Sequence, residues 1–212
     1  MMRSYLTEFI GTFFLVVTVC LTVTVSQPLA AIAIGSALMF MVYMGGHISG
    51  GHYNPAVTLA VWLRGKLPGK EVIPYWIAQL LGGVVAGFVS TYVLRHAFVV
   101  LPSPHASVLA ILIAEFIFTF ALCLVVLQTA TSSRTTGNSY YGLAIGFTIL
   151  SGTVAVGSVS GAAFNPAIGV GPALAGLVWH QPFAQVWYYI VGPLVGGAVA
   201  AAVFKFQSPD AD

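Results

Sequence analysis

Two stretches of the chain decide its fold: SGGHYNPAV at residues 49–57 and SGAAFNPAI at residues 160–168. Both contain the triplet Asn-Pro-Ala, and they lie 111 residues apart, measured from Asn54 to Asn165. Two further pairs recur at similar offsets, TEFI at residues 7–10 with AEFI at 114–117, and Gly-Gly at 82–83 with Gly-Gly at 196–197. The pattern predicts a single domain made of two repeats, at about residues 1–103 and 104–212.

The composition points to lipid as the solvent of most of the chain. Of the 212 residues, 58% are hydrophobic and only 6% are charged, and the mean hydropathy is +0.96. A soluble domain carries roughly a quarter charged residues, so this composition excludes a soluble enzyme, a nucleic-acid-binding protein and a secreted disulfide scaffold. Cys20 and Cys123 lack the spacing of a metal or redox pair. We therefore expect no nucleic-acid partner, no cofactor and no metal.

Apolar runs long enough to cross the membrane give the number of spans. About 20 helical residues cross the ~30 Å hydrocarbon core. We expect an all-α membrane protein with six transmembrane helices, at about residues 5–25, 29–46, 72–94, 107–131, 139–157 and 184–206. Two apolar pieces, residues 55–63 and 166–177, are too short to span and are predicted to be re-entrant half-helices.

The basic residues predict the orientation, because cytoplasmic loops are enriched in Lys and Arg. With the N-terminus inside, all Lys and Arg residues except Arg95 fall on the cytoplasmic side, and the C-terminus is also cytoplasmic. Three spans in each half place the second half upside down relative to the first. Short loops and the absence of an N-glycosylation sequon fit a bacterial cytoplasmic membrane.

The Asn-Pro pair has a clear physical reading at a helix start. Proline suits the first helical position because its missing N–H would be unpaired there anyway, and the Asn side-chain oxygen caps the new helix. The Asn amide N–H groups then point away from the helix. Two such caps meeting at the membrane midplane would offer paired donors between two positive helix ends. Inverted repeats with broken helices also occur in secondary transporters, which is the alternative class.

The two Asn-Pro-Ala motifs, the GGHISGGH run at residues 45–52 and one Glu in the first helix of each half resemble the aquaporin and glycerol-facilitator channels, the major intrinsic proteins. The resemblance covers essentially the whole chain. It implies a passive channel for water and small uncharged solutes, not an enzyme, assembled as a homotetramer in the lipid bilayer. The residues it assigns to the pore motifs are Asn54, Pro55, Ala56, Asn165, Pro166 and Ala167.

Glu8 and Glu115 are the acids within the predicted spans, and such residues are functional candidates by default. Their symmetric placement favours bracing of free backbone N–H groups in the re-entrant loops, and a proton relay is the alternative. His47 and His52 flank the first loop without a third metal ligand. We expect them, and His47 in particular, to hydrogen-bond the loop backbone.

The resemblance places four residues at the selectivity filter: Ile34, Thr153, Ala162 and Ile168. The family ordinarily has Arg directly after the second Asn-Pro-Ala, where this chain has Ile168. Loss of that Arg predicts an apolar outer constriction, wider than a strict water filter. Water is the expected permeant, and ammonia, glycerol, urea, hydrogen peroxide and undissociated metalloid acids are further possibilities.

Overall fold

The computed structural model describes residues 1–208, which contain helices and no strand; the end of the predicted second repeat, residues 209–212, lies outside this range. The principal helices are α1 (Met2–Thr24), α2 (Ala30–Ser49), α3 (Pro55–Leu63), α4 (Gly69–Leu94), α5 (Val108–Val126), α6 (Tyr141–Ser160), α7 (Pro166–Gly176) and α8 (Tyr188–Gln207). Short turns of other helix types follow α5 and α7: a π-helix η1 (Leu127–Thr131), then 3-10 helices η2 (Ser133–Thr135) and η3 (Leu177–Trp179).

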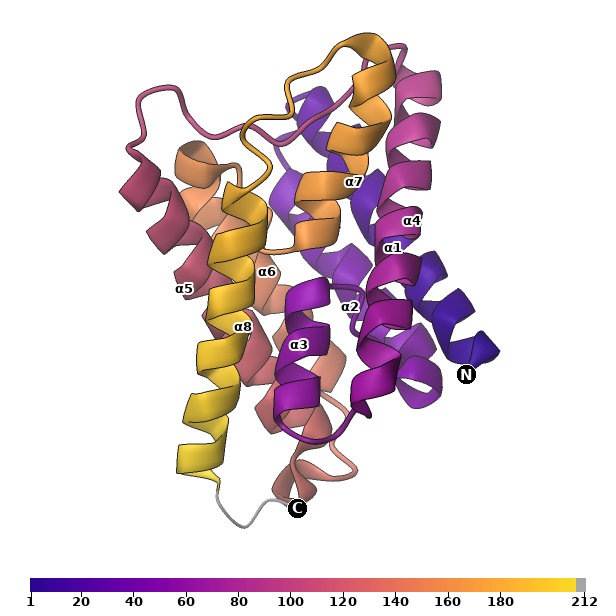
Figure 1. The fold of residues 1–212 in the computed structure, drawn as a ribbon, viewed down its shortest axis with the longest axis vertical. Coiled ribbons are helices and arrows are strands. Elements are labelled where there is room, and N and C mark those ends of the chain that lie inside the picture. The colour runs from indigo at the N-terminus through magenta and orange to yellow at the C-terminus, as the bar shows by residue number, and fades with distance from the viewer. Residues whose placement is uncertain (209–212) are drawn as a thin grey trace.

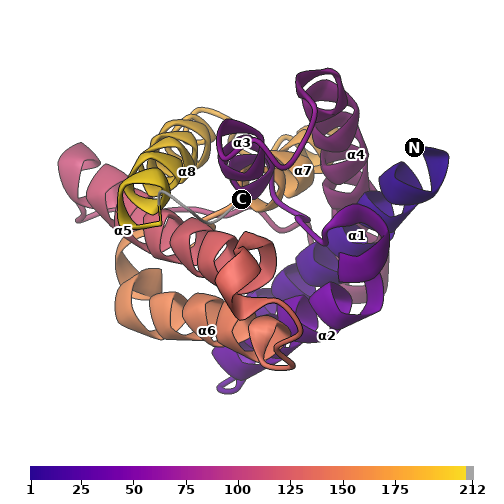
Figure 2. The same cartoon turned by 90° about the horizontal axis from the view of Figure 1, so that it is seen from below.

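Six helices in the described range are long and apolar enough to cross a membrane: α1, α2, α4, α5 with its π-helical end, α6 and α8. The two short helices α3 and α7 run from the middle of the molecule toward opposite ends (Figure 1). Seen from below, α3 and α7 lie one behind the other between α8 and α4 (Figure 2). The predicted all-α fold with six spans and two half-helices is confirmed.

The glycine-rich approaches to the motifs extend two helices beyond their predicted ends at about residues 46 and 157. Helices α2 and α6 continue through these stretches to Ser49 and Ser160. Each helix then ends at a glycine with left-handed backbone, φ 92° at Gly50 and 87° at Gly161, a conformation that costs glycine no steric clash. The non-helical segments are therefore only residues 50–54 and 161–165.

Two glycines hold the half-helices against the long helices of the opposite half. A Cβ on Gly83 of α4 would lie 2.7 Å from the carbonyl oxygen of Ala167 in α7. A Cβ on Gly197 of α8 would lie 2.6 Å from the carbonyl oxygen of Ala56 in α3. Small residues allow helix backbones to approach this closely in a membrane, and here they position both Asn-Pro-Ala segments.

We expect Gly197→Val to disrupt the fold, because its side chain would meet the Ala56 carbonyl with no flexible neighbour to give way. Overpacking of this kind costs about 1–3 kcal/mol or more. The measurement is the yield of monodisperse protein in detergent and its thermal midpoint. Val195→Leu is the matched control, since Val195 lies on α8 and is 48% exposed. Equal midpoints for the two variants would contradict the close packing.

Candidate functional site

Each motif begins a half-helix in the same way. The Asn54 side-chain oxygen accepts the N–H of Ala56 at 2.8 Å, and the Asn165 side-chain oxygen accepts the N–H of Ala167 at 2.9 Å. Both asparagines have extended backbone, with φ −156° and −157°, and proline occupies the first turn of each helix. Capping satisfies one of the backbone donors that a helix start leaves unpaired.

The two asparagines also bind each other's loops. Asn54 Nδ2 donates to the carbonyl oxygen of Phe164 at 2.9 Å, and Asn165 Nδ2 donates to the carbonyl oxygen of Tyr53 at 2.9 Å. These crossed bonds join segments more than a hundred residues apart and bring the half-helices together at their N-terminal ends. Each amide retains one further N–H that has no acceptor within residues 1–208.

Glu8 lies fully buried on α1 and accepts four hydrogen bonds. Its Oε1 accepts the Ser49 hydroxyl at 2.7 Å and the His52 N–H at 3.0 Å. Its Oε2 accepts the Tyr53 N–H at 2.6 Å and the Gln79 side-chain amide at 2.8 Å. Both N–H groups from the first loop thus find an acceptor that lipid cannot supply.

Glu115 on α5 makes the corresponding contacts in the second half. Its Oε1 accepts the Ser160 hydroxyl at 2.7 Å and the Ala163 N–H at 3.1 Å, and its Oε2 accepts the Phe164 N–H at 2.7 Å. A fourth partner equivalent to Gln79 is missing within residues 1–208. Glu115 therefore accepts one hydrogen bond fewer than Glu8, although each loop donates the same three.

Two tyrosines support the loops, and the sequence analysis missed them. The Tyr75 hydroxyl donates to the Ser49 carbonyl at 2.8 Å, and the Tyr189 hydroxyl donates to the Ser160 carbonyl at 2.7 Å. Tyr75 and Tyr189 are separated by the same offset as the Gly-Gly pairs. Extending the repeat alignment beyond the motifs would have found them.

His47 does not hydrogen-bond the loop as expected. Its side chain is exposed on the last turn of α2 and has no hydrogen-bond partner within residues 1–208. His52, five residues later, is buried, with Nδ1 3.1 Å from the Thr58 hydroxyl oxygen. Gln79 binds the same Thr58 oxygen at 2.8 Å, so His52 belongs to the polar network around Glu8.

A narrow cavity lies where the half-helices meet. Its volume is about 10 Å³, close to the minimum that holds a single water molecule. Asn54, Asn165 and His52 supply its polar side chains. The rest of the wall is Gly51 and large aliphatic residues, most of them in pairs from the two halves: Leu15 with Leu122, Leu38 with Ile149, Val57 with Ile168, and also Val126 and Ile145.

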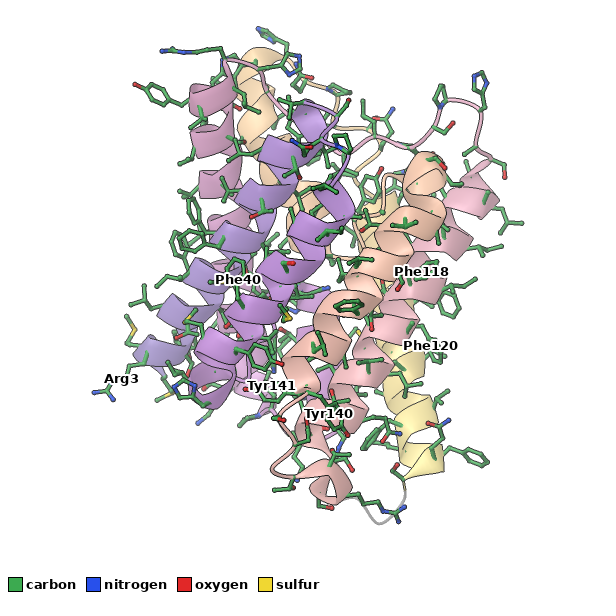
Figure 3. The ribbon with its side chains drawn as sticks, turned by 180° about the vertical axis from the view of Figure 1, so that it is seen from behind. Arg3, Phe40, Phe118, Phe120, Tyr140 and Tyr141 are labelled. Atoms are coloured by element: carbon green, nitrogen blue, oxygen red, sulfur yellow. The ribbon has the colours of Figure 1, made fainter. Side chains whose placement is uncertain are left out.

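A wide vestibule opens toward the end of the molecule where α6 begins. One part has a volume of about 550 Å³ and is lined by polar residues that include His47, Lys66 and Asn138. An adjoining part of about 460 Å³ shares Lys66 with the first and is also lined by His52. His52 also lines the narrow cavity, so the vestibule and the narrow cavity adjoin the same side chain. Figure 3 shows Tyr140 and Tyr141 at this end of α6, and Arg3 projecting at the same end from α1.

The four residues expected at the filter are not gathered around this constriction. Ile168, 2% exposed, lines the narrow cavity. Ile34 is also buried but does not line it, although its repeat equivalent Ile145 does. Thr153 and Ala162 are partly buried, and the Thr153 hydroxyl bonds the Ile149 carbonyl of its own helix at 2.9 Å. These four residues lie on different helices and loops, and counting along the sequence could not predict which of their side chains lie close together.

Six spans that enclose two half-helices, with a narrow cavity at their junction and a wide vestibule beside it, are the architecture of a membrane channel. Comparison with known proteins agrees: residues 1–204 match the family described as Major intrinsic protein. The chain belongs to the major intrinsic protein family, which contains the aquaporins. It is a passive channel for water and small solutes, as members of this family are channels rather than enzymes.

Individual relatives match over nearly the whole chain. It is 40% identical to Aquaporin NIP1-1 of Oryza sativa subsp. japonica, covering 94% of this chain and 72% of that protein. It is 35% identical to Nodulin-26 of Glycine max, in an alignment that covers 96% of this chain and 77% of that protein. The fold matches the aquaglyceroporin from Plasmodium falciparum with a TM-score of 0.86 at 23% identity, covering 98% and 97% of the two chains. These similarities support a multi-pass membrane protein, but the plant relatives give no support to the bacterial origin expected from the short loops.

Because Gln79 contacts Glu8 and has no counterpart at Glu115 within residues 1–208, we expect substitutions of the two glutamates to differ in their effect on stability. In Glu115→Gln, the new amide replaces an acceptor of the Phe164 N–H, leaving buried donors unpaired at about 1–3 kcal/mol each. In Glu8→Gln, the new amide faces the Tyr53 N–H in the same way. Once the Gln79 amide rotates, however, the new amide can donate to the Gln79 oxygen, which is buried without a partner. We expect a smaller loss of thermal midpoint in detergent for Glu8→Gln.

Combining Glu8→Gln with Gln79→Leu is the control, because it removes the compensating oxygen. The double variant should lose stability beyond the sum of its single substitutions, since neighbouring groups are coupled. Equal losses for Glu8→Gln and Glu115→Gln would show that Gln79 does not compensate.

Proposed function

We propose that this channel selects its solutes at the aliphatic constriction around Asn54, Asn165 and Ile168. The supporting observation is the narrow cavity, whose polar groups are the two Asn amides and His52 while most of its wall is aliphatic. A permeant must shed most of its water and accept hydrogen bonds from the Asn amides. Water and small neutral solutes such as glycerol, urea, ammonia, hydrogen peroxide and undissociated metalloid acids meet this requirement.

The same site disfavours cations. Helices α3 and α7 direct their N-terminal ends, with their partial positive charge, toward the asparagines. The aliphatic wall supplies no oxygen ligand for a dehydrated ion. Without an Arg after the second motif, exclusion of cations and protons rests on these helix ends, and Ala162 and Thr153 would line an uncharged outer part of the path.

The membrane arrangement completes the proposal. The chain is a single domain of two inverted repeats, with both ends and the wide vestibule in the cytoplasm, and it assembles as a homotetramer without enzymatic activity. The matching contacts of Glu8 and Glu115 support the repeats. Lys66 in the vestibule and Arg3 at the same end support the orientation (Figure 3).

Stopped-flow light scattering on proteoliposomes tests the function. Osmotic shrinkage and solute-driven swelling should be faster than in empty vesicles, with a low activation energy and no dependence on an imposed ion gradient. Asn165→Asp should slow both, because it removes the amide donor and places a carboxylate in the membrane. Transport that requires an ion gradient would instead identify a secondary transporter.

Substitutions of Ile168 test the constriction. Ile168→Ala removes bulk from the narrow cavity and should raise glycerol flux more than water flux, by several-fold in their ratio. Ile168→Arg should lower glycerol flux more than water flux, because bulk excludes the larger solute first. The readout is the glycerol-to-water permeability ratio in vesicles of equal protein content.

Ile34→Ala is the matched control for these variants. It removes the same number of atoms from a buried residue that does not line the narrow cavity. It should lower stability by about 2–5 kcal/mol and leave the glycerol-to-water ratio unchanged. A ratio that responds to Ile34 and not to Ile168 would place selection elsewhere.

A further inference from the structure

A further cavity at the surface shares no lining residue with the narrow cavity or the vestibule. It has a volume of about 380 Å³ and is lined by Phe88, Thr91, Tyr92, Arg95 and Trp179. These residues come from the end of α4 and from η3, which follows α7. The ends of α4 and α7 lie near each other at the top of Figure 1, opposite the end at which α3 and α8 terminate.

The chemistry of this cavity is aromatic and cationic. The Phe88 and Trp179 rings lie 5.8 Å apart between centroids and join α4 to η3. The Arg95 guanidinium lies over the Tyr92 ring, 5.0 Å from its centroid. Thr91 offers little to a ligand, because it is buried and its hydroxyl already donates to the Gly87 carbonyl at 2.8 Å.

The charge of Arg95 is not neutralised within residues 1–208. The carboxylates in this range are Glu8, Glu71 and Glu115. Glu8 and Glu115 are buried against the re-entrant loops. Glu71 lies in the first turn of α4, at the opposite end of that helix, and accepts the Tyr5 hydroxyl at 2.6 Å. Arg95 is exposed and free to bind an anion.

An apolar stripe leads from this cavity along α4. The side chains of Ile77, Leu81, Val85 and Phe88 are 53%, 53%, 39% and 41% exposed, and their spacing places them on one face of the helix. From Ile77 to Phe88 the stripe extends about 16 Å at ~1.5 Å per residue. That length is about half of the ~30 Å hydrocarbon core, which is the reach of one acyl chain in one leaflet.

We propose that this surface binds an anionic phospholipid of the phosphatidylglycerol type. The phosphate lies against Arg95, whose planar guanidinium suits bidentate contact with phosphate oxygens. Tyr92 and Trp179 lie at headgroup level, where aromatic side chains gather in membrane proteins, and an acyl chain follows the stripe on α4. A net negative headgroup complements the positive charge of Arg95. The orientation proposed above makes this the outer leaflet, but the binding itself does not depend on it.

Quenching of Trp179 by brominated lipids tests the site in reconstituted vesicles. The Trp179 signal is the difference in emission between the native protein and Trp179→Phe. Titration with brominated phosphatidylglycerol should reach half-maximal quenching at about fivefold lower mole fraction than with brominated phosphatidylcholine, which corresponds to ~1 kcal/mol for one basic side chain near the membrane surface. Raising the ionic strength should reduce this preference in the native protein, because Arg95 is exposed.

Variants at basic positions separate the site from general attraction to anionic lipid. Arg95→Gln should abolish the preference, Arg95→Lys should retain part of it, and Lys205→Gln, at the far end of α8, should leave it unchanged. Equal midpoints for the two lipids in the native protein, or a preference that survives Arg95→Gln, would overturn the proposal. So would protection of Trp179 from both brominated lipids, since that result would mean that a second copy of the chain covers this surface.

Discussion

Two crossed hydrogen bonds, from Asn54 to the Phe164 carbonyl and from Asn165 to the Tyr53 carbonyl, determine the arrangement at the centre of the molecule. Lipid offers no hydrogen bonds, so extended backbone inside a membrane must find its partners within the protein. Each asparagine caps its own helix, binds the opposite loop and retains one N–H for the channel. Because the same side chains do all three, neither half-helix can move along the membrane normal without breaking the other loop's contacts.

The constriction follows from this arrangement. With both helix starts fixed, the residue after each motif, Val57 or Ile168, enters the narrow cavity on its own side. Pairs of aliphatic residues from the long helices close the remaining walls, so the wall of the passage approximates the symmetry of the repeats. His52 breaks that symmetry, since the equivalent position in the second loop is Ala163. The first loop accordingly has a polar network with Thr58 and Gln79 that the second loop lacks.

The elements and the helix caps could be predicted from the sequence because local chemistry fixes them, whereas the crossed bonds to the opposite loops could not. Asn-Pro defines a helix start, and the predicted α3 boundaries match those observed at Pro55–Leu63. The second span is predicted to end at about residue 46, whereas α2 continues to Ser49, with Gly45 packed closely against the Tyr53 side chain. His47 is exposed and His52 is buried. This difference depends on the path of the loop after α2, which the sequence alone does not give. The residues that face Ile168 across the narrow cavity depend on the distances between helices. The spacing of residues along the sequence does not give these distances.

The exchange of half-helices between the two halves has a consequence for biosynthesis. Helix α3 belongs to the first half, yet its motif backbone packs against Gly197 on α8, which is translated after every other helix described above. The Asn54 amide likewise finds its acceptor only when Phe164 has been translated. During translation the first re-entrant segment therefore stays without its final partners until α8 is inserted. Assembly of the conducting path is a late event in the maturation of this chain, whatever the order in which the individual spans enter the bilayer.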